Sequence, residues 1–186
     1  RIGIVFNGSP LFTGDGGSGE SEIRKWIIEN DMLECVVSLP DQLFFNTGIS
    51  TYIWIVTNNK KSQRKGKVQL IDGSTFYKPM KKSLGSKRKE ISSDQTESLI
   101  QTYQNFEENE FSKIFDNEFF GYTKVIIEQP LVENGKMILK KDGNPKPNTK
   151  LRDSERIPLT ENIEEYFNRE VEPHLPQSWM DREKDK

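Results

Sequence analysis

Two adjacent aromatic residues followed by polar ones form the segment of the chain whose side chains are best suited to bind a nucleobase. Its residues are Phe44, Phe45, Asn46 and Thr47. The segment lies in a predicted turn between two strands, where an exposed ring can stack on a base for about 1–3 kcal/mol. The alternative is a hydrophobic turn tucked under a helix, and composition alone favours that alternative.

A strongly basic stretch is the second candidate. The 186-residue chain has a formal net charge of −2 at pH 7, yet residues 60–90 hold 11 Lys and Arg against 2 Asp and Glu. Such a local positive field attracts phosphates. The candidate DNA contacts in it are Lys60, Lys61, Arg64, Lys65 and Lys67. The alternative is a solvated, mobile lysine-rich loop, which the lack of aromatic residues between Lys60 and Lys67 favours.

Three other features carry little chemistry. The glycine-rich loop at residues 14–19 lacks the Lys-Ser/Thr of a phosphate-binding P-loop and the spacing of a dinucleotide fingerprint, which favours a flexible loop. His174, the single histidine, has no nearby nucleophile to activate. No cluster of residues has metal-ligand spacing. No metal site is therefore expected, and none of these features by itself identifies a catalytic residue or a cofactor site.

The composition also bears on the compartment. No run of about 18 apolar residues and no signal peptide is present, so no membrane partner is expected. The single cysteine, Cys35, excludes a disulfide framework and is interpreted as a small buried apolar residue. A cytoplasmic protein is expected.

Hydrophobic periodicity predicts an α/β protein. Short apolar or β-branched runs predict strands at residues 1–6, 34–39, 49–57, 68–71, 111–115 and 119–127. Helical spacing predicts helices at residues 21–30, 94–106 and 160–171, the second opened by a capping box of Asp94 and Glu97 and the third capped by Thr160. The first strand is expected to be buried, and strand–helix–strand order indicates a βαβ unit.

Five segments, in matching order along nearly the whole chain, resemble one protein family. They are residues 7–15 (NGSPLFTGD), 19–24 (GESEIR), 39–49 (LPDQLFFNTGI), 151–159 (LRDSERIPL) and 166–174 (YFNREVEPH). They resemble the modification subunit of type I restriction–modification systems, which are adenine-N6 DNA methyltransferases using S-adenosylmethionine. The basic segment at residues 60–93 matches least.

This resemblance implies a fold and a division of the chain. The family has a class I (Rossmann-like) methyltransferase fold, a mixed sheet with helices on both faces, and the matching part is its C-terminal half. Residues 1–90 would complete that core and include a basic loop at 60–90. Residues 91–152 would form an irregular α+β extension, and residues 153–186 an acidic helical tail toward a partner subunit.

The resemblance also implies which chemistry is missing. The family's cofactor loop and its Asn/Asp-Pro-Pro-aromatic tetrad lie upstream of the matching part, and Pro-Pro does not occur here. No catalytic residue or bound cofactor is therefore expected in this chain, and an isolated fragment is expected to be inactive. In related adenine methyltransferases an aromatic residue after the penultimate core strand packs against the flipped base. Phe44 matches that place and Phe45 is an adjacent competitor, so stacking becomes the favoured interpretation, with Asn46 and Thr47 as further DNA contacts.

The expected partners are DNA and the specificity and restriction subunits of the type I complex. In the last predicted helix, Ile163 and Phe167 fit either core packing or a subunit contact. Because the chain opens at Arg1 rather than Met, we expect a piece of a longer protein. The alternatives are a stand-alone nucleic-acid or protein-binding module derived from a methyltransferase, motivated by the basic stretch, and a scaffold without any ligand.

Overall fold

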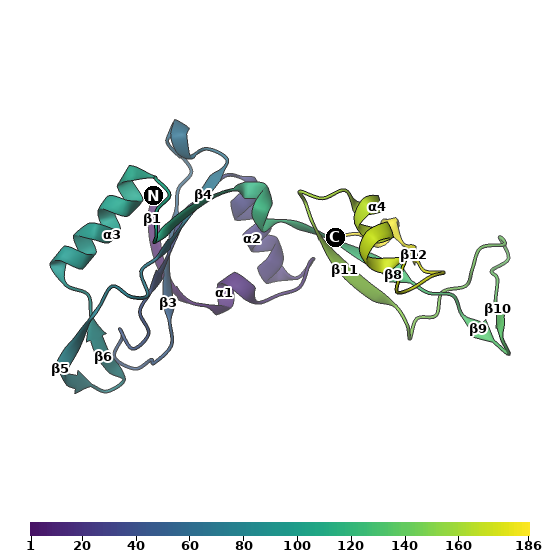
Figure 1. Cartoon of the computed structure of the whole chain (residues 1–186), viewed down its shortest axis with the longest axis horizontal. Helices are drawn as coiled ribbons and strands as arrows, with labels where there is room; N and C mark the ends of the chain where they lie inside the picture. The colour runs from purple at the N-terminus through teal and green to yellow at the C-terminus, as the bar shows by residue number, and fades with distance from the viewer. The chain divides into compact units, whose positions relative to one another are not determined.

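The structure is a computed structural model that describes residues 1–186. The chain divides into two compact units, residues 1–117 and residues 118–186 (Figure 1). Each unit has its own sheet, and we describe them separately. Both combine strands with few helices, so the expected mixed α/β class is confirmed.

A five-stranded mixed sheet in the order β1-β3-β2-β4-β7 forms the first unit. Its strands are β1 (Ile2–Asn7), β2 (Leu33–Leu39), β3 (Thr51–Val56), β4 (Lys67–Asp72) and β7 (Ser112–Asp116). β3 runs antiparallel to both β1 and β2, which are therefore parallel to each other. β2 pairs parallel with β4, and β7 closes the far edge antiparallel. The predicted strand–helix–strand unit is present, with β3 inserted between its two strands.

Helices cover both faces of this sheet. They are α1 (Ser9–Phe12), α2 (Gly19–Glu29) and α3 (Ser93–Asn105), with a short 3-10 turn, η1 (Ser62–Arg64). Figure 1 shows α2 and α3 on opposite sides of the sheet. The capping box of α3 is formed by Ser92 and Gln95, not by Asp94 and Glu97 as expected, because Ser92 is the residue with extended backbone immediately before the helix.

The core of the first unit is centred on β2. Cys35, Val37 and Leu39 pack with Ile71 of β4, and Leu99 of α3 lies against this cluster. β2 is almost wholly buried because it has a partner strand on each side. The prediction of Cys35 as a small buried core residue is confirmed, and burial raises the pKa of its thiol to about 12.

β1 differs from its expectation. It forms a strand, but it lies at the edge of the sheet, and Ile2 and Val5 are exposed. The apolar Ile23 and Trp26 of α2 are exposed as well. The prediction of a buried first strand was wrong because β1 has a hydrogen-bonding neighbour, β3, on one side only.

A buried ion pair joins the sheet to α3. The side chains of Glu34 and Arg64 are 1% and 3% exposed, and the Arg64 Nε lies 3.5 Å from the Glu34 carboxylate. The guanidinium also donates to Gln69 Oε1 at 3.0 Å and to the Tyr103 carbonyl, and it lies between the rings of Tyr103 and Phe106 at 4.4 and 4.3 Å. Burial and the Glu34 carboxylate raise the pKa of Tyr103 to about 12. β2, η1 and α3 are thus tied at one point.

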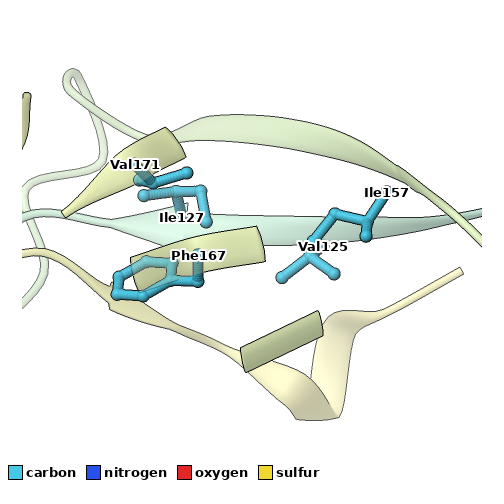
Figure 2. Packing of buried hydrophobic residues seen from close by; sticks show 5 residues of the cluster. All are labelled: Val125, Ile127, Ile157, Phe167 and Val171. Carbon is cyan, nitrogen blue, oxygen red and sulfur yellow. The ribbon is translucent and has the colours of Figure 1, made fainter. Parts of the chain in front are cut away.

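The second unit is a small antiparallel sheet covered by a helical segment. Its elements are η2 (Asn117–Phe120), β8 (Tyr122–Glu128), β9 (Val132–Glu133), β10 (Lys136–Met137), β11 (Asp153–Pro158), α4 (Ile163–Tyr166), a π-helical turn η3 (Phe167–Val171), β12 (Trp179–Met180) and η4 (Arg182–Lys184). β8 is the middle strand between β11 and β12. Figure 2 shows its core, in which Val125, Ile127 and Ile157 of the sheet meet Phe167 and Val171.

Three details of the second unit differ from the sequence-based expectations. Residues 117–120 form a 3-10 turn, so the strand begins only at Tyr122. The helix is capped by Asn162 rather than Thr160, because the Asn162 side chain accepts hydrogen bonds from the Glu164 and Glu165 amides. Residues 153–158, expected within a helical tail, pair with β8 as a strand. Phe167 is buried, in agreement with core packing.

Glu128 is the buried charge of the second unit. Its side chain is 1% exposed, and its Oε1 lies 2.7 Å from Arg152 Nη2 and 3.1 Å from Lys184 Nζ. Burial tends to raise the pKa of this carboxyl, but the hydrogen bonds from Arg152 and Lys184 outweigh burial and hold the pKa below its ordinary value. The resembling segment at residues 151–159 therefore begins with a structural ion pair.

The Arg64 cluster generates a stability prediction. Arg64→Met leaves Glu34 buried with only the partly exposed Arg1 as an ion-pair partner, and we expect the unfolding free energy to fall by about 3–5 kcal/mol. Lys65→Met, at the exposed neighbouring position, should change it by about 0.5 kcal/mol or less. Urea unfolding followed by tryptophan fluorescence measures both variants. Equal stability of the two variants would show that Arg64 does not hold the unit together.

Glu128 generates a pH prediction. Because its pKa is lower in the folded than in the unfolded chain, its stabilisation is present above the unfolded pKa, near 4.5, and is lost as the pH falls through the folded pKa. We expect Glu128→Gln to lower the melting temperature at pH 7 and to flatten its decline as the pH falls below about 4.5. Glu133→Gln, at an exposed position, is the control. A decline as steep in Glu128→Gln as in the unsubstituted chain would contradict the assignment.

Candidate nucleic-acid interface

The Phe44–Thr47 turn is exposed at the end of the first unit's sheet, between β2 and β3. Phe44 and Thr47 form an isolated antiparallel bridge, with Phe45 and Asn46 at the tip. Phe44 is 38% and Phe45 59% exposed, and Asn46 is exposed as well. The turn is therefore not tucked under a helix, and both rings present surface on which a flat ligand can stack.

A basic hairpin is attached to this turn through the backbone. It consists of β5 (Lys78–Leu84) and β6 (Lys87–Glu90). The Ser86 amide donates to the Phe45 carbonyl at 3.0 Å, and the amides of Arg88 and Lys89 donate to the Gln42 carbonyl at 2.9 and 3.2 Å. These hydrogen bonds do not depend on side-chain identity, and they hold the hairpin beside the turn.

Lys89 adds a side-chain contact at the same place. Its ammonium group pairs with the Asp41 carboxylate and lies 4.0 Å from the centre of the Tyr77 ring. The hydrogen bond with Asp41 raises the pKa of Lys89. Lys89 is thereby engaged within the chain and serves to dock the hairpin.

The basic residues predicted near the start of the stretch divide into two groups. Lys60 is buried, with its ammonium group 2.6 Å from Asp31 Oδ1 and 2.7 Å from the Lys67 carbonyl. Arg64 is buried against Glu34, and Lys67 pairs with Asp116 at 3.1 Å. Only Lys61 and Lys65 are exposed without an acidic partner. The charges of Lys60 and Arg64 thus stabilise the fold and cannot reach a phosphate.

Sequence reasoning placed the β5–β6 hairpin in a loop and included none of its residues among the candidate contacts. A signal was present: the Gly85-Ser86 dipeptide forms the two-residue connection, and Gly85 has φ +59°. Glycine before a small polar residue is typical of such hairpin turns. The strands were overlooked because they contain no β-branched residue and are rich in lysine.

The glycine-rich loop does not have the geometry of an anion site. The Arg24 guanidinium donates to the carbonyl oxygens of Pro10, Thr13 and Gly14 at 3.2, 2.5 and 3.3 Å. Ser18 Oγ accepts from the Ser21 amide at the start of α2. These carbonyl groups point at a cation of the chain, which is the opposite of a loop that directs its amides at a phosphate.

The chain contains neither a metal-binding cluster nor a helix that could span a membrane. No group of three or more His, Cys, Asp or Glu side chains is placed to hold a metal ion. None of the helices combines the length and apolar character that crossing a bilayer requires.

Comparison with known proteins connects this geometry to a family. The MjaVII methylase subunit of Methanocaldococcus jannaschii, a type I restriction enzyme, is 31% identical over 119 residues, covering 63% of this chain and 20% of that protein. The HindI methylase subunit of Haemophilus influenzae is 54% identical over 55 residues, covering 30% of this chain and 12% of that protein. The chain thus spans about a fifth or less of the length of these curated relatives.

A solved structure agrees with the sequence relatives. The methyltransferase subunit of a type I restriction–modification system from Streptococcus thermophilus superposes with a TM-score of 0.54 at 26% identity, covering 62% of this chain and 23% of that one. The sequence model described as N-6 DNA Methylase matches residues 1–126, which include the whole first unit and the turn with its hairpin. This match covers more than half of the chain, and the chain therefore belongs to the N-6 DNA methylase family.

Proposed function

We propose that this chain is the part of a type I modification subunit that holds the target adenine during N6 methylation of DNA. The observation that carries the proposal is the exposed Phe44–Thr47 turn after β2 in a chain of the N-6 DNA methylase family. The methyl donor of the longer protein would be S-adenosylmethionine. Its binding loop and the residues that contact the adenine amino group would lie on a part of the protein outside these 186 residues.

The open edge of β1 supports the assignment to half of a larger sheet. An edge strand exposes a row of unpaired N–H and C=O groups that another strand can pair with. Here that edge strand is apolar, and Ile2, Val5 and the neighbouring Trp26 are exposed. We infer that the first unit is the C-terminal half of a class I methyltransferase sheet and that an upstream strand covers β1.

In this proposal the turn replaces stacking contacts that a flipped base has lost. A base extruded from duplex DNA gives up its stacking neighbours, and a protein ring can replace one of them. Phe44 holds the position that the family resemblance favours. The ring of Phe45 lies close to Gly85 of the hairpin, where an added Cβ would meet its ring atoms at 3.7 and 3.8 Å. In this proposal Phe44 stacks on adenine, Phe45 supports it, and Asn46 and Thr47 contact the adjacent backbone.

Holding the base in this way contributes rate through orientation. A stacked ring restricts the adenine to one plane, so that its amino nitrogen can be aligned with the methyl group to be transferred. Lys61 and Lys65, which are exposed, lie beside η1 at the opposite end of the sheet from the turn, so they would contact a more distant part of the DNA backbone. Lys67 could do so only by leaving Asp116.

The proposed partners follow the family. They are DNA, the specificity subunit that reads its sequence, and the restriction subunit, in the cytoplasm. Within the proposed division into residues 1–90, 91–152 and 153–186, the last segment would face the specificity subunit. It carries 10 Asp and Glu against 5 Lys and Arg, a surface suited to a basic partner.

A second candidate function is a stand-alone nucleic-acid or protein-binding module. The exposed charges of the β5–β6 hairpin favour it, because they require no catalytic machinery to be useful. The two candidates differ in one observable: a modification enzyme that contains this chain transfers methyl groups, whereas a binding module does not.

The turn generates a prediction for the assembled modification enzyme. Phe44→Ala should weaken binding of the extruded adenine by about 1–3 kcal/mol, or roughly 5- to 150-fold, because one stacking partner is lost. Phe44→Trp should retain binding. The measurements are 2-aminopurine fluorescence at the target position and methyl incorporation, with circular dichroism as the control for folding.

Phe45→Ala is the matched comparison for that experiment, and its effect should be smaller. A large loss in Phe45→Ala with none in Phe44→Ala would transfer the stacking role to Phe45. Unchanged extrusion and methylation in both variants would remove the role from the turn.

The missing cofactor loop generates a second prediction. The purified 186-residue chain should incorporate no methyl groups into DNA from radiolabelled S-adenosylmethionine, whereas the assembled enzyme should incorporate them. Equilibrium dialysis should detect no tight binding of S-adenosylmethionine to the chain. Methyl incorporation by the chain alone would refute the assignment of the reactive machinery to another part of the protein.

A further inference from the structure

We propose that the β5–β6 hairpin is a phosphate-binding arm that holds the DNA backbone beside the base bound at the Phe44–Thr47 turn. This inference rests on the proposed function and deepens it, since it assigns the DNA backbone contact to residues that the family resemblance covers least. It is based on the charges of the hairpin, on their availability, and on the attachment of the hairpin to the turn.

The hairpin concentrates positive charge without internal compensation. Its basic residues are Lys78, Lys81, Lys82, Lys87, Arg88 and Lys89. One acid, Glu90, lies within the two strands, and Lys89 alone forms an ion pair, with Asp41. Lys81 and Lys82 are exposed, and neither has an acidic partner in this chain. Closely spaced like charges repel one another, and a bound polyanion would relieve that repulsion.

The attachment to the turn gives these charges a defined position. Three backbone hydrogen bonds join the hairpin to Gln42 and Phe45, and the Lys89–Asp41 pair adds a fourth link. The Gly85-Ser86 connection lies directly against Phe45. A nucleotide whose base stacks at this turn therefore has its own or its neighbouring phosphates next to the hairpin.

The loop at residues 60–67 shows that composition does not decide this role. It holds five Lys and Arg in eight residues, but Lys60 and Arg64 are buried beside acids and Lys67 pairs with Asp116. In the hairpin, Lys78, Lys81, Lys82 and Arg88 are exposed. A solvent-exposed row of ammonium groups attracts phosphates without reading bases, and a two-stranded ribbon can lie along a DNA groove.

The test compares two neutralised lysine pairs in the 186-residue chain. Lys81→Gln with Lys82→Gln removes two charges from the hairpin, and Lys140→Gln with Lys141→Gln removes two adjacent exposed charges from the second unit. Fluorescence anisotropy with a labelled DNA duplex, from 50 to 300 mM salt, gives the affinity and its salt dependence. If both hairpin lysines contact phosphates, the slope of log K against log salt falls by about 1.8.

The hairpin variant should bind at least about tenfold more weakly near 0.1 M salt, and the control pair should bind as the unsubstituted chain does. Equal slopes for the two variants, or no salt-dependent binding of the unsubstituted chain to DNA, would overturn the inference. Tighter binding to polyglutamate than to duplex DNA would also overturn it and assign the hairpin to an acidic protein partner.

The assembled enzyme separates this inference from the proposed function. There the hairpin variant should raise KM for DNA and leave kcat unchanged, because the base is still held by the turn. Absence of methyl transfer by the unsubstituted enzyme would contradict the proposed function alone. Normal methyl transfer with an unchanged KM in the hairpin variant would contradict the hairpin alone.

Discussion

The buried Glu34–Arg64 pair is the interaction on which the first unit depends. A carboxylate near the start of the most buried strand is costly unless cations are brought to it, and here they are Arg64 of the basic stretch and the partly exposed Arg1. Arg64 in turn needs the rings and carbonyl of α3 to satisfy its planar face and remaining N–H groups. One desolvated charge thereby fixes β2, the 60–67 loop and α3 together.

β2 connects this buried ion pair to the Phe44–Thr47 turn. The strand that carries Glu34 ends at Leu39, and the turn with Phe44 and Phe45 begins a few residues later. Because β2 is held on both sides and by α3, the turn extends from a rigid base, and the hairpin is joined to it by backbone hydrogen bonds. Aromatic rings on a rigid support lose little conformational entropy when they bind a planar ligand.

The two compact units distribute charge in different ways. In the first, Asp31 and Glu34 pair with the buried Lys60 and Arg64, and the hairpin is left as the exposed positive surface. In the second, Glu128 draws in Arg152 and Lys184, which neutralises part of a segment that is otherwise acidic. The net charge of consecutive blocks of sequence therefore describes the surface charge poorly. Residues that form buried ion pairs count toward the net charge of a block but do not contribute to the charge of the surface.

The sequence by itself determined the family, the aromatic turn and several of the helices and strands. Alternating and helical apolar patterns are local, so the strands at 34–39 and 68–71 and the helix at 94–106 could be recognised, as could Cys35 as a core residue. Only the tertiary structure decided which lysine and arginine side chains are exposed on the surface, where a phosphate can reach them. Lys60 and Arg64 cannot be told from Lys81 and Lys82 by composition, because their burial depends on Asp31 and Glu34, about 30 residues away. The edge position of β1 was likewise decided by pairing with β3, a long-range contact that no local pattern encodes.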